Sequence, residues 1–170
     1  MISELDSRSN MAREQADDYV TPERALRDGP PPEVCRHASL AVARNFARAW
    51  IEARISRGVA PDDILVLGLS RPTMESLTAW LTAEGIPASF LLTDLLPGTV
   101  RLSTIHSAKG LDAAHVLLFS GHELEGRGDE EARRLLYIGM TRAREELCVS
   151  YHGESRLMKE LVAAVSSRAH

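Results

Sequence analysis

The chain has 170 residues, of which 44% are hydrophobic but only 5% are aromatic. This composition fits one globular domain whose core is mainly aliphatic. The formal net charge of −4 has the wrong sign for binding nucleic acid through bulk charge, so any such contact must be local. No apolar run approaches the length of a membrane span or of a secretory signal, and we expect a cytoplasmic protein with no membrane partner.

The two cysteines, Cys35 and Cys148, are too few and too far apart in the sequence to indicate a disulfide framework or a zinc site. Each lies in an apolar segment with the pattern of a strand. The six histidines are scattered without metal-binding spacing. We therefore expect buried free thiols in a reducing compartment, and no metal ligands.

Residues 1–32 are expected to be a leader or a truncated element. They are polar and charged, their apolar periodicity is poor even over residues 12–26, and they end in a proline run that cannot continue a helix. The folded domain is expected to cover residues 33–170.

The first half of that domain alternates between strand and helix patterns. Strands are expected over residues 33–37, 63–69 and 88–92, and helices over residues 40–57 and 72–84. Ser39 is placed to cap the first helix, Gly58 to end it, and Gly85 to end the second.

The hydrophobic residues of both helices recur every three or four positions, which predicts one core-facing side on each. In the first helix these residues are Val42, Phe46, Trp50 and Ile51, opposite Arg44, Arg48, Glu52 and Arg54. In the second they are Met74, Leu77 and Leu81. Trp50 and Trp80 are expected to pack in the core rather than stack on bases.

Residues 99–121 are predicted to form a strand, a polar turn and a second strand. Apolar and polar residues alternate from Val100 until the pattern breaks at residues 107–110. The continuous apolar run 116–119 is typical of a strand buried on both faces. Ligands bind outside the carboxyl ends of strands in open α/β sheets, so a turn rich in Thr, His, Ser, Lys and Gly is a candidate polyanion site.

The second half continues the alternation. A glycine-rich acidic loop is expected over residues 120–129, a helix over 130–144, a strand over 146–151 and a closing helix over 155–165. Strands and helices in this order imply right-handed crossovers and an α/β fold in three layers, with a mostly parallel sheet covered by helices on both faces.

Two sequence blocks, TIHSAKGLD at residues 104–112 and RRLLYIGMTRARE at residues 133–145, closely resemble motifs V and VI of the UvrD/Rep-type superfamily 1 DNA helicases. The resemblance covers about residues 40–165 and implies the second, C-terminal RecA-like lobe of a P-loop motor. Roughly ten residues separate Ser89 from Val100, which implies that the large accessory insertion of many such helicases is absent.

The resemblance implies contacts with single-stranded DNA in the first block. Thr104 and His106 match the motif V positions that touch the DNA backbone, and we include Ser107 with them. Backbone contacts need only hydroxyls, N–H groups and cations, and they carry no sequence code.

The resemblance also implies a nucleotide site. Lys109 and Gly110 match the Lys-Gly pair of the motif V turn. Asp112 stands where the family has Glu near the ribose, one methylene shorter. Arg142 matches the catalytic arginine that reaches across the interlobe cleft to the terminal phosphates, a task that suits the planar guanidinium fork. Gly139 replaces a common Ala, and the resemblance gives this change no functional weight.

Other arginines near motif VI have a simpler interpretation. Arg133, Arg134 and Arg144 are expected either to be solvated or to pair with the neighbouring acids Glu130, Glu131 and Glu145.

The chain contains no GxxxxGK[ST] loop and no strand that ends in the paired acids that hold Mg²⁺. We therefore expect ATP and Mg²⁺ only in an assembled motor, completed by an N-terminal P-loop lobe, and neither of them on this chain alone. Two interpretations stay open. The chain is the C-terminal lobe of an ATP-dependent 3′–5′ DNA helicase, or a free-standing module that docks on DNA or a protein without ATPase activity.

Overall fold

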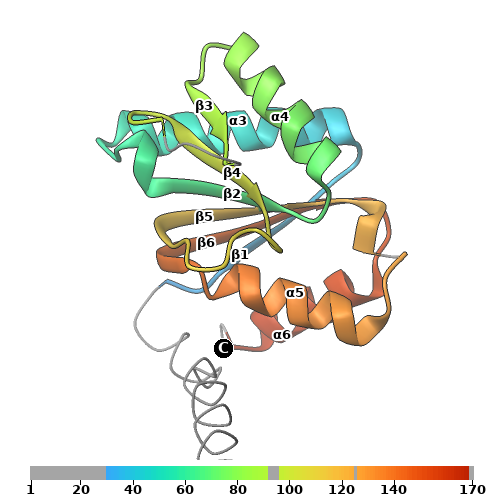
Figure 1. The fold of residues 1–170 in the computed structure, drawn as a ribbon. Helices are drawn as coiled ribbons and strands as arrows, with labels where there is room; N and C mark the ends of the chain where they lie inside the picture. Colours follow the sequence, from blue (N-terminus) through green and yellow to red (C-terminus); the bar gives the residue numbers. More distant parts are fainter. Residues whose placement is uncertain (1–29, 92–95, 125, 169–170) are drawn as a thin grey trace, which may run out of the picture.

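The fold is described from a computed structural model, which covers residues 30–91, 96–124 and 126–168 (Figure 1). The leader expected over residues 1–32, including the segment 12–26, lies almost wholly outside the described residues. Among the described helices, none has both the length and the hydropathy needed to cross a membrane.

The described strands form one sheet in the order β1-β6-β5-β2-β4-β3, and every pairing in it is parallel. The strands are β1 (Glu33–His37), β2 (Ile64–Gly68), β3 (Ala88–Phe90), β4 (Val100–Thr104), β5 (Ala113–Ser120) and β6 (Ala143–His152). The helices are α3 (Leu40–Ser56), α4 (Arg71–Ala83), α5 (Asp129–Met140) and α6 (Arg156–Arg168). Short 3-10 turns cover Pro61–Asp63 and His122–Leu124. The order and type of the predicted elements are confirmed.

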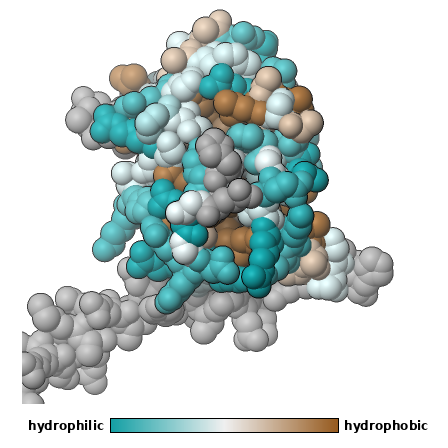
Figure 2. All heavy atoms as spheres, turned by 90° about the vertical axis from the view of Figure 1, so that its right-hand side faces the viewer, coloured by the Kyte–Doolittle hydropathy of each residue, from teal (hydrophilic) through white to brown (hydrophobic). Residues whose placement is uncertain are grey.

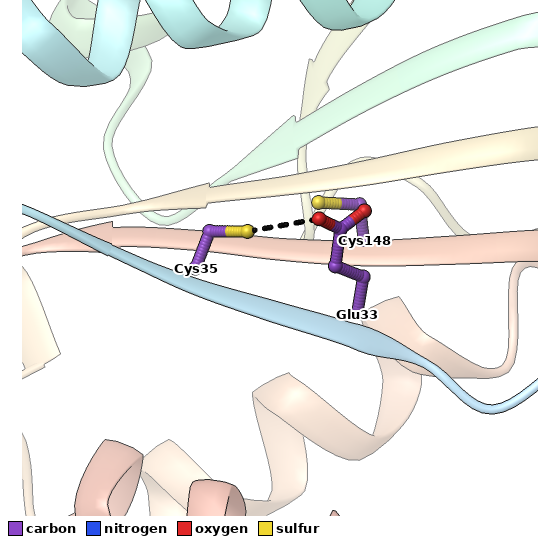
Figure 3. Close-up of side chains that lie close together, drawn as sticks. All are labelled: Glu33, Cys35 and Cys148. Atoms are coloured by element: carbon purple, nitrogen blue, oxygen red, sulfur yellow. Dashed lines mark hydrogen bonds between the residues drawn. The ribbon is translucent and has the colours of Figure 1, made fainter.

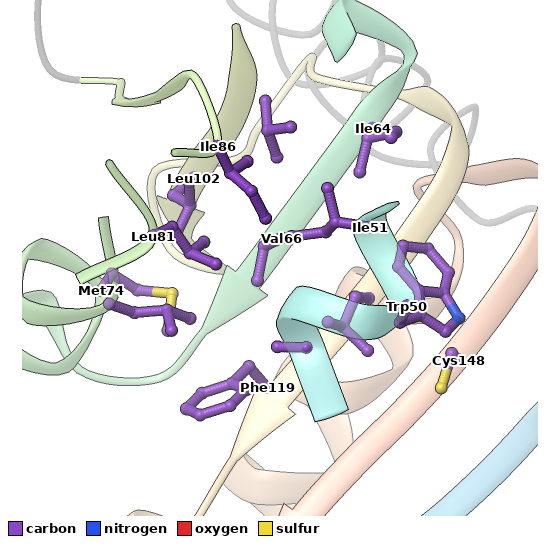
Figure 4. Close-up of a cluster of buried hydrophobic side chains, with 14 of the residues drawn as sticks. Trp50, Ile51, Ile64, Val66, Met74, Leu81, Ile86, Leu102, Phe119 and Cys148 are labelled. Carbon is purple, nitrogen blue, oxygen red and sulfur yellow. The ribbon is translucent and has the colours of Figure 1, made fainter. Parts of the chain in front are cut away.

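Alternation along the strands divides the core into two halves. On β2, Ile64 and Val66 pack beneath α3 and α4, whereas Leu65 and Leu67 pack on the opposite face against α5 and α6. The first half, with Trp50 and Phe119, is drawn in Figure 4. Helices therefore cover both faces of the sheet, which confirms the three-layer prediction (Figure 1).

Helix α3 begins and ends as expected, but its buried side is rotated from the predicted one. The Ser39 side chain accepts a hydrogen bond from the Val42 backbone N–H, and Gly58 follows the helix with φ +90°. Val42 itself is 47% exposed, whereas Ala43 and Ala47 are fully buried, so placing Val42 in the core was wrong. Small alanines let α3 approach the sheet closely, which a count of large apolar residues does not anticipate.

Arg54, which the sequence placed on the solvent side of α3, is buried. Its guanidinium lies 3.8 Å from the Trp50 ring centroid and forms two hydrogen bonds with the Glu146 carboxylate on β6, one of them 3.0 Å long. His115 on β5 contacts the same carboxylate at 2.8 Å through Nδ1. A buried guanidinium is stable here because an acid from a distant strand neutralises it.

Among the element boundaries that differ from the prediction, two have a clear cause in the structure. Strand β4 ends at Thr104 because the Ser107 N–H turns back to the Thr104 carbonyl oxygen. Helix α5 ends at Met140, not at residue 144, because Ala143 already pairs with Ala113 as the first residue of β6. Pairing with β5 therefore outweighs the helical pattern at the end of motif VI.

Gly139 has a packing role that the resemblance does not indicate. A Cβ atom at this position would lie 2.8 Å from Leu118 Cδ2 and 3.2 Å from Ile105 Cδ1. The missing side chain lets α5 approach the sheet at the turn that leads to Arg142.

We expect Glu146 to make stability sensitive to acid. Burial by itself would raise the pKa of Glu146, but the hydrogen bonds and charges of Arg54 and His115 outweigh it and hold the pKa below its ordinary value of 4.5. The stability that the carboxylate contributes is therefore complete above that value and is lost as the pH falls through the folded pKa.

Urea unfolding between about pH 7 and about pH 3 measures this effect. Glu146→Gln should cost about 2 kcal/mol at neutral pH and should flatten the acid limb of the stability curve. The control is Glu145→Gln, which alters an exposed neighbouring carboxylate. The same acid dependence in the wild type and in Glu146→Gln would contradict the prediction.

Candidate nucleotide and nucleic-acid site

Residues 105–112, which we call the crossing segment, return the chain from the end of β4 to the start of β5 without a helix (Figure 1). Ile105 and Ala108 are buried in the core half that contains α5, and Leu111 packs against it. The other side chains of the segment point outward and are exposed: His106, Ser107, Lys109 and Asp112. Apolar residues thus hold the segment on the sheet, while the polar residues that the sequence singled out face solvent.

The turn after β4 is held by Thr104. Its Oγ1 accepts a hydrogen bond from the Ser107 backbone N–H at 3.3 Å and lies 3.1 Å from Ser107 Oγ. Thr104 is only 8% exposed, whereas His106 and Ser107 are exposed. Thr104 thus holds the turn, while His106 and Ser107 remain accessible.

The crossing segment turns twice in succession, and Gly110 lies in the second turn. The Ala108 N–H donates to the Ile105 carbonyl oxygen, the Leu111 N–H donates to the Ala108 carbonyl oxygen, and Gly110 between them has φ +78°. This left-handed conformation disfavours any residue with a Cβ atom. Lys109, beside it, is exposed.

Arg142 and Asp112 lie at the other end of the crossing segment. The Arg142 carbonyl oxygen accepts a hydrogen bond of 3.0 Å from the Ala113 N–H, next to Asp112. The Arg142 N–H bonds to the Gly139 carbonyl oxygen, so its backbone is fixed on both sides. Its side chain is half-buried, and its Nε is buried without a hydrogen-bond partner among the described residues. An unsatisfied buried donor on a cation is suited to an external anion.

The carboxylate of Asp112 is not isolated. Oδ2 of Asp112 lies 3.7 Å from Nη1 of Arg144. The backbone carbonyl oxygen of Asp112 accepts a hydrogen bond of 2.8 Å from Nη2 of Arg101. Arg144 also approaches Asp63 at 3.2 Å. The sequence gives no local signal of this arrangement, because Arg101 lies on the neighbouring strand β4 and Asp63 in the turn before β2.

The structure brings together only some of the predicted site residues. Thr104 is level with Gly68, Phe119 and Ser150 across the sheet, and Ser150 lies seven positions beyond Ala143 on β6. At the spacing of residues along a strand, the two ends of the crossing segment, near Thr104 and near Ala113, are therefore about 20 Å apart. His106 and Ser107 therefore occupy one end, Asp112 and Arg142 the other, and Lys109 and Gly110 the part between.

The remaining arginines of motif VI have partners different from those considered. Arg133 pairs with Glu160 of α6, and Arg144 pairs with Asp63 and Asp112. These arginines therefore do not pair with the acids next to them in the sequence. Each ion pair joins α5 or the start of β6 to an element that is distant in the chain.

The side of the molecule where β2 leads into α4 faces the viewer in Figure 2. It is mostly hydrophilic, with hydrophobic residues in smaller separate areas.

Among the described residues, one group of side chains could hold a metal ion: Glu33 and Cys35 on β1 and Cys148 on β6. This group includes no residue of the crossing segment.

Gly110→Ala is expected to lower the free energy of unfolding by about 1–2 kcal/mol. A methyl group would meet no atom within 4 Å, so the cost comes from the left-handed backbone alone. Gly126→Ala is the matched control, since its surroundings are equally open and its φ lies outside that region. Denaturant unfolding measures both variants, and an equal loss in both would contradict the conformational role of Gly110.

Part of the chain is similar to known helicases. Residues 99–150 match the family model described as UvrD-like helicase C-terminal domain. DNA helicase II of Haemophilus influenzae is 37% identical over 94 residues, which cover 49% of this chain and 13% of that protein. The ATP-dependent DNA helicase Rep of Buchnera aphidicola is 42% identical over 60 residues, covering 31% of this chain and 9% of that protein. The matched part of the chain thus spans about an eighth or less of the length of these relatives.

A solved structure resembles nearly the whole domain. The C-terminal domain of a possible DNA helicase from Lactobacillus plantarum WCFS1 superposes with a TM-score of 0.69 at 25% sequence identity. The superposition covers 84% of this chain and 89% of that one.

Proposed function

We propose that this chain, of which residues 99–150 match the UvrD-like helicase C-terminal domain and whose α/β fold is RecA-like, is the C-terminal motor lobe of an ATP-dependent 3′–5′ DNA helicase. A P-loop lobe, on the same polypeptide or on a separate subunit, would complete the ATP site. The observation that carries the proposal is Arg142, a half-buried guanidinium whose Nε has no partner among the described residues.

Arg142 has the features needed to act on a phosphate from a facing surface. Its backbone is fixed between α5 and the start of β6, so the guanidinium starts from a defined position. Its fork engages phosphate oxygens in pairs, and the buried Nε gains the partner that it lacks. In this proposal ATP with Mg²⁺ supplies the phosphoryl group, and Arg142 stabilises the charge that develops on it.

Asp112 is proposed to bind the ribose beside Arg142. Its exposed carboxylate can accept hydrogen bonds from sugar hydroxyls, and Arg144 at 3.7 Å holds it in place. The side chain is one methylene shorter than the family's Glu, so the nucleotide must sit closer to this lobe. Lys109 and Gly110 contribute a cation and an accessible backbone between the two ends.

The other end of the crossing segment is proposed to contact single-stranded DNA. His106 and Ser107 are exposed and offer an imidazole and a hydroxyl to backbone phosphates, and Thr104 fixes the turn that carries them. The net charge of −4 predicts weak binding by the lobe alone, because long-range attraction is missing.

A short, anchored segment also offers a route for coupling. Ile105 and Ala108 hold it on the sheet between the DNA end and the nucleotide end. We propose that movement of the P-loop lobe against Arg142 and Asp112 shifts His106 and Ser107 with them, as one body.

Arg142→Ala should lower ATP turnover by about 10³-fold or more in the motor assembled with its P-loop lobe, without unfolding the domain. Steady-state phosphate release measures turnover, and circular dichroism with thermal unfolding checks the fold. Arg134→Ala is the matched control because Arg134 is an exposed arginine of α5. Unchanged turnover in Arg142→Ala would remove the central observation of the proposal.

His106→Ala should weaken binding of a single-stranded oligonucleotide, because His106 is exposed and is proposed to contact the DNA backbone. Lys159→Ala is the control, since it removes an exposed lysine of α6, far along the chain from the proposed contact. Fluorescence anisotropy at several salt concentrations measures binding by both variants. Equal effects of the two variants would count against a local DNA site.

A further inference from the structure

Three potential metal ligands meet where β1 pairs with β6 (Figure 3). The register places Glu33 opposite Cys148, and Cys35 lies two residues further along β1 on the same face. Cys35 Sγ donates a hydrogen bond of 3.3 Å to the Glu33 carboxylate. The two sulfur atoms and a carboxylate oxygen all lie within 4.8 Å of one another, and no other group of three such ligands is this close among the described residues.

The strand register argues against a disulfide between the two cysteines. Cys35 is level with Ser150 rather than with Cys148, and both thiols are free. A diagonal across neighbouring strands puts the two Cα atoms about 8 Å apart. A disulfide needs less than about 7 Å, so it would require backbone movement.

A metal ion can join the same two sulfurs because it adds an atom between them. In a tetrahedral zinc site with Zn–S bonds of about 2.3 Å, the sulfurs are about 3.8 Å apart. The atoms of the cluster are already within 4.8 Å, so side-chain rotation by about 1 Å closes the site.

We propose that Cys35, Cys148 and Glu33 bind a thiophilic divalent cation of the zinc class, through two thiolates and one carboxylate, with a water in the fourth position. On binding, each S–H bond breaks, a metal–sulfur bond forms, and two protons pass to solvent, while the ion stays divalent. The ion would enter from the side of Glu33, which is exposed, since Cys35 is half-buried and Cys148 is fully buried.

The thiols of this cluster are compatible with their apolar surroundings when they are protonated. Burial, together with the nearby Glu33 carboxylate, raises the pKa of Cys35 to about 11, and burial also raises the pKa of Cys148. Without a cation both thiols therefore stay neutral near neutral pH and pack as small hydrophobic groups. Metal affinity should rise with pH because binding releases two protons.

An ion at this position would join an edge strand to a strand of the candidate site. Strand β1 pairs only with β6 in the described sheet, and β6 begins one residue after Arg142. The site thus tightens the attachment of β1 without touching the crossing segment. This inference does not rest on the proposed helicase function.

The test uses the full reduced, metal-free chain titrated with Co²⁺ and Cd²⁺. We expect one equivalent of each, thiolate-to-metal charge-transfer absorption in the ultraviolet, the visible bands of tetrahedral Co²⁺, and a higher melting temperature. Cys35→Ser and Cys148→Ser should abolish the charge-transfer absorption. Glu33→Gln should keep it while weakening affinity by about tenfold.

Cys35→Ser is the decisive variant because Cys35 is half-buried, whereas a hydroxyl at the fully buried Cys148 threatens folding. Glu130→Gln, which neutralises an exposed acid on α5, is the control and should bind as the wild type does. Three results would overturn the proposal: no thiolate absorption with Cd²⁺, equal binding by Cys35→Ser, or ready closure of an intramolecular disulfide by a mild oxidant, detected by mass.

Discussion

Parallel pairing imposes the constraint on which this structure depends, because each connection must return the chain from the carboxyl edge of the sheet to its amino edge. Helices make this return after β1, β2 and β5 and bury their apolar sides on the sheet. Only a few residues are available after β4, and the crossing segment makes the return without a helix. Along this segment, buried apolar side chains that hold it on the sheet alternate with exposed polar side chains. One short segment therefore carries accessible groups to both edges of the sheet.

Internal pairing decides which arginines remain available for an external ligand. Arg54 is neutralised by Glu146, Arg133 by Glu160, and Arg144 by Asp63 and Asp112. The described residues provide no acidic partner for Arg142, and its Nε is left unsatisfied, as are the Nε atoms of Arg44 and Arg101. A lobe with more acidic than basic residues can thus still present cations such as Arg142 to a phosphate, because several of its other arginines are compensated locally.

The polar residues inside the sheet layers follow the same logic of compensation. Glu146 and Arg54 are tolerated in a largely apolar environment because the guanidinium engages both carboxylate oxygens, and His115 shares one of these oxygens with Arg54. Cys35 and Cys148 are tolerated because they are neutral thiols. Both groups join β6, the strand that follows Arg142, to other elements: Glu146 joins it to α3 and β5, and Cys148 lies beside β1.

The sequence by itself determined the order and type of the elements, the caps at Ser39 and Gly58, and the two motif blocks. These features are local: a helix period, a strand alternation or a motif occupies a few turns or a few residues. The fold class follows from them because alternating strands and helices can bury both faces of a sheet in few ways.

Only the tertiary structure decided which residues from distant parts of the sequence contact each other. It ended α5 at Met140 because Ala143 pairs with Ala113, and it buried Arg54 because Glu146 reaches it from β6. It brought Cys35 next to Cys148, which their separation in the sequence had argued against. In each case the partner comes from a distant strand, and the register between such strands is set by the packing of the whole sheet rather than by any local pattern.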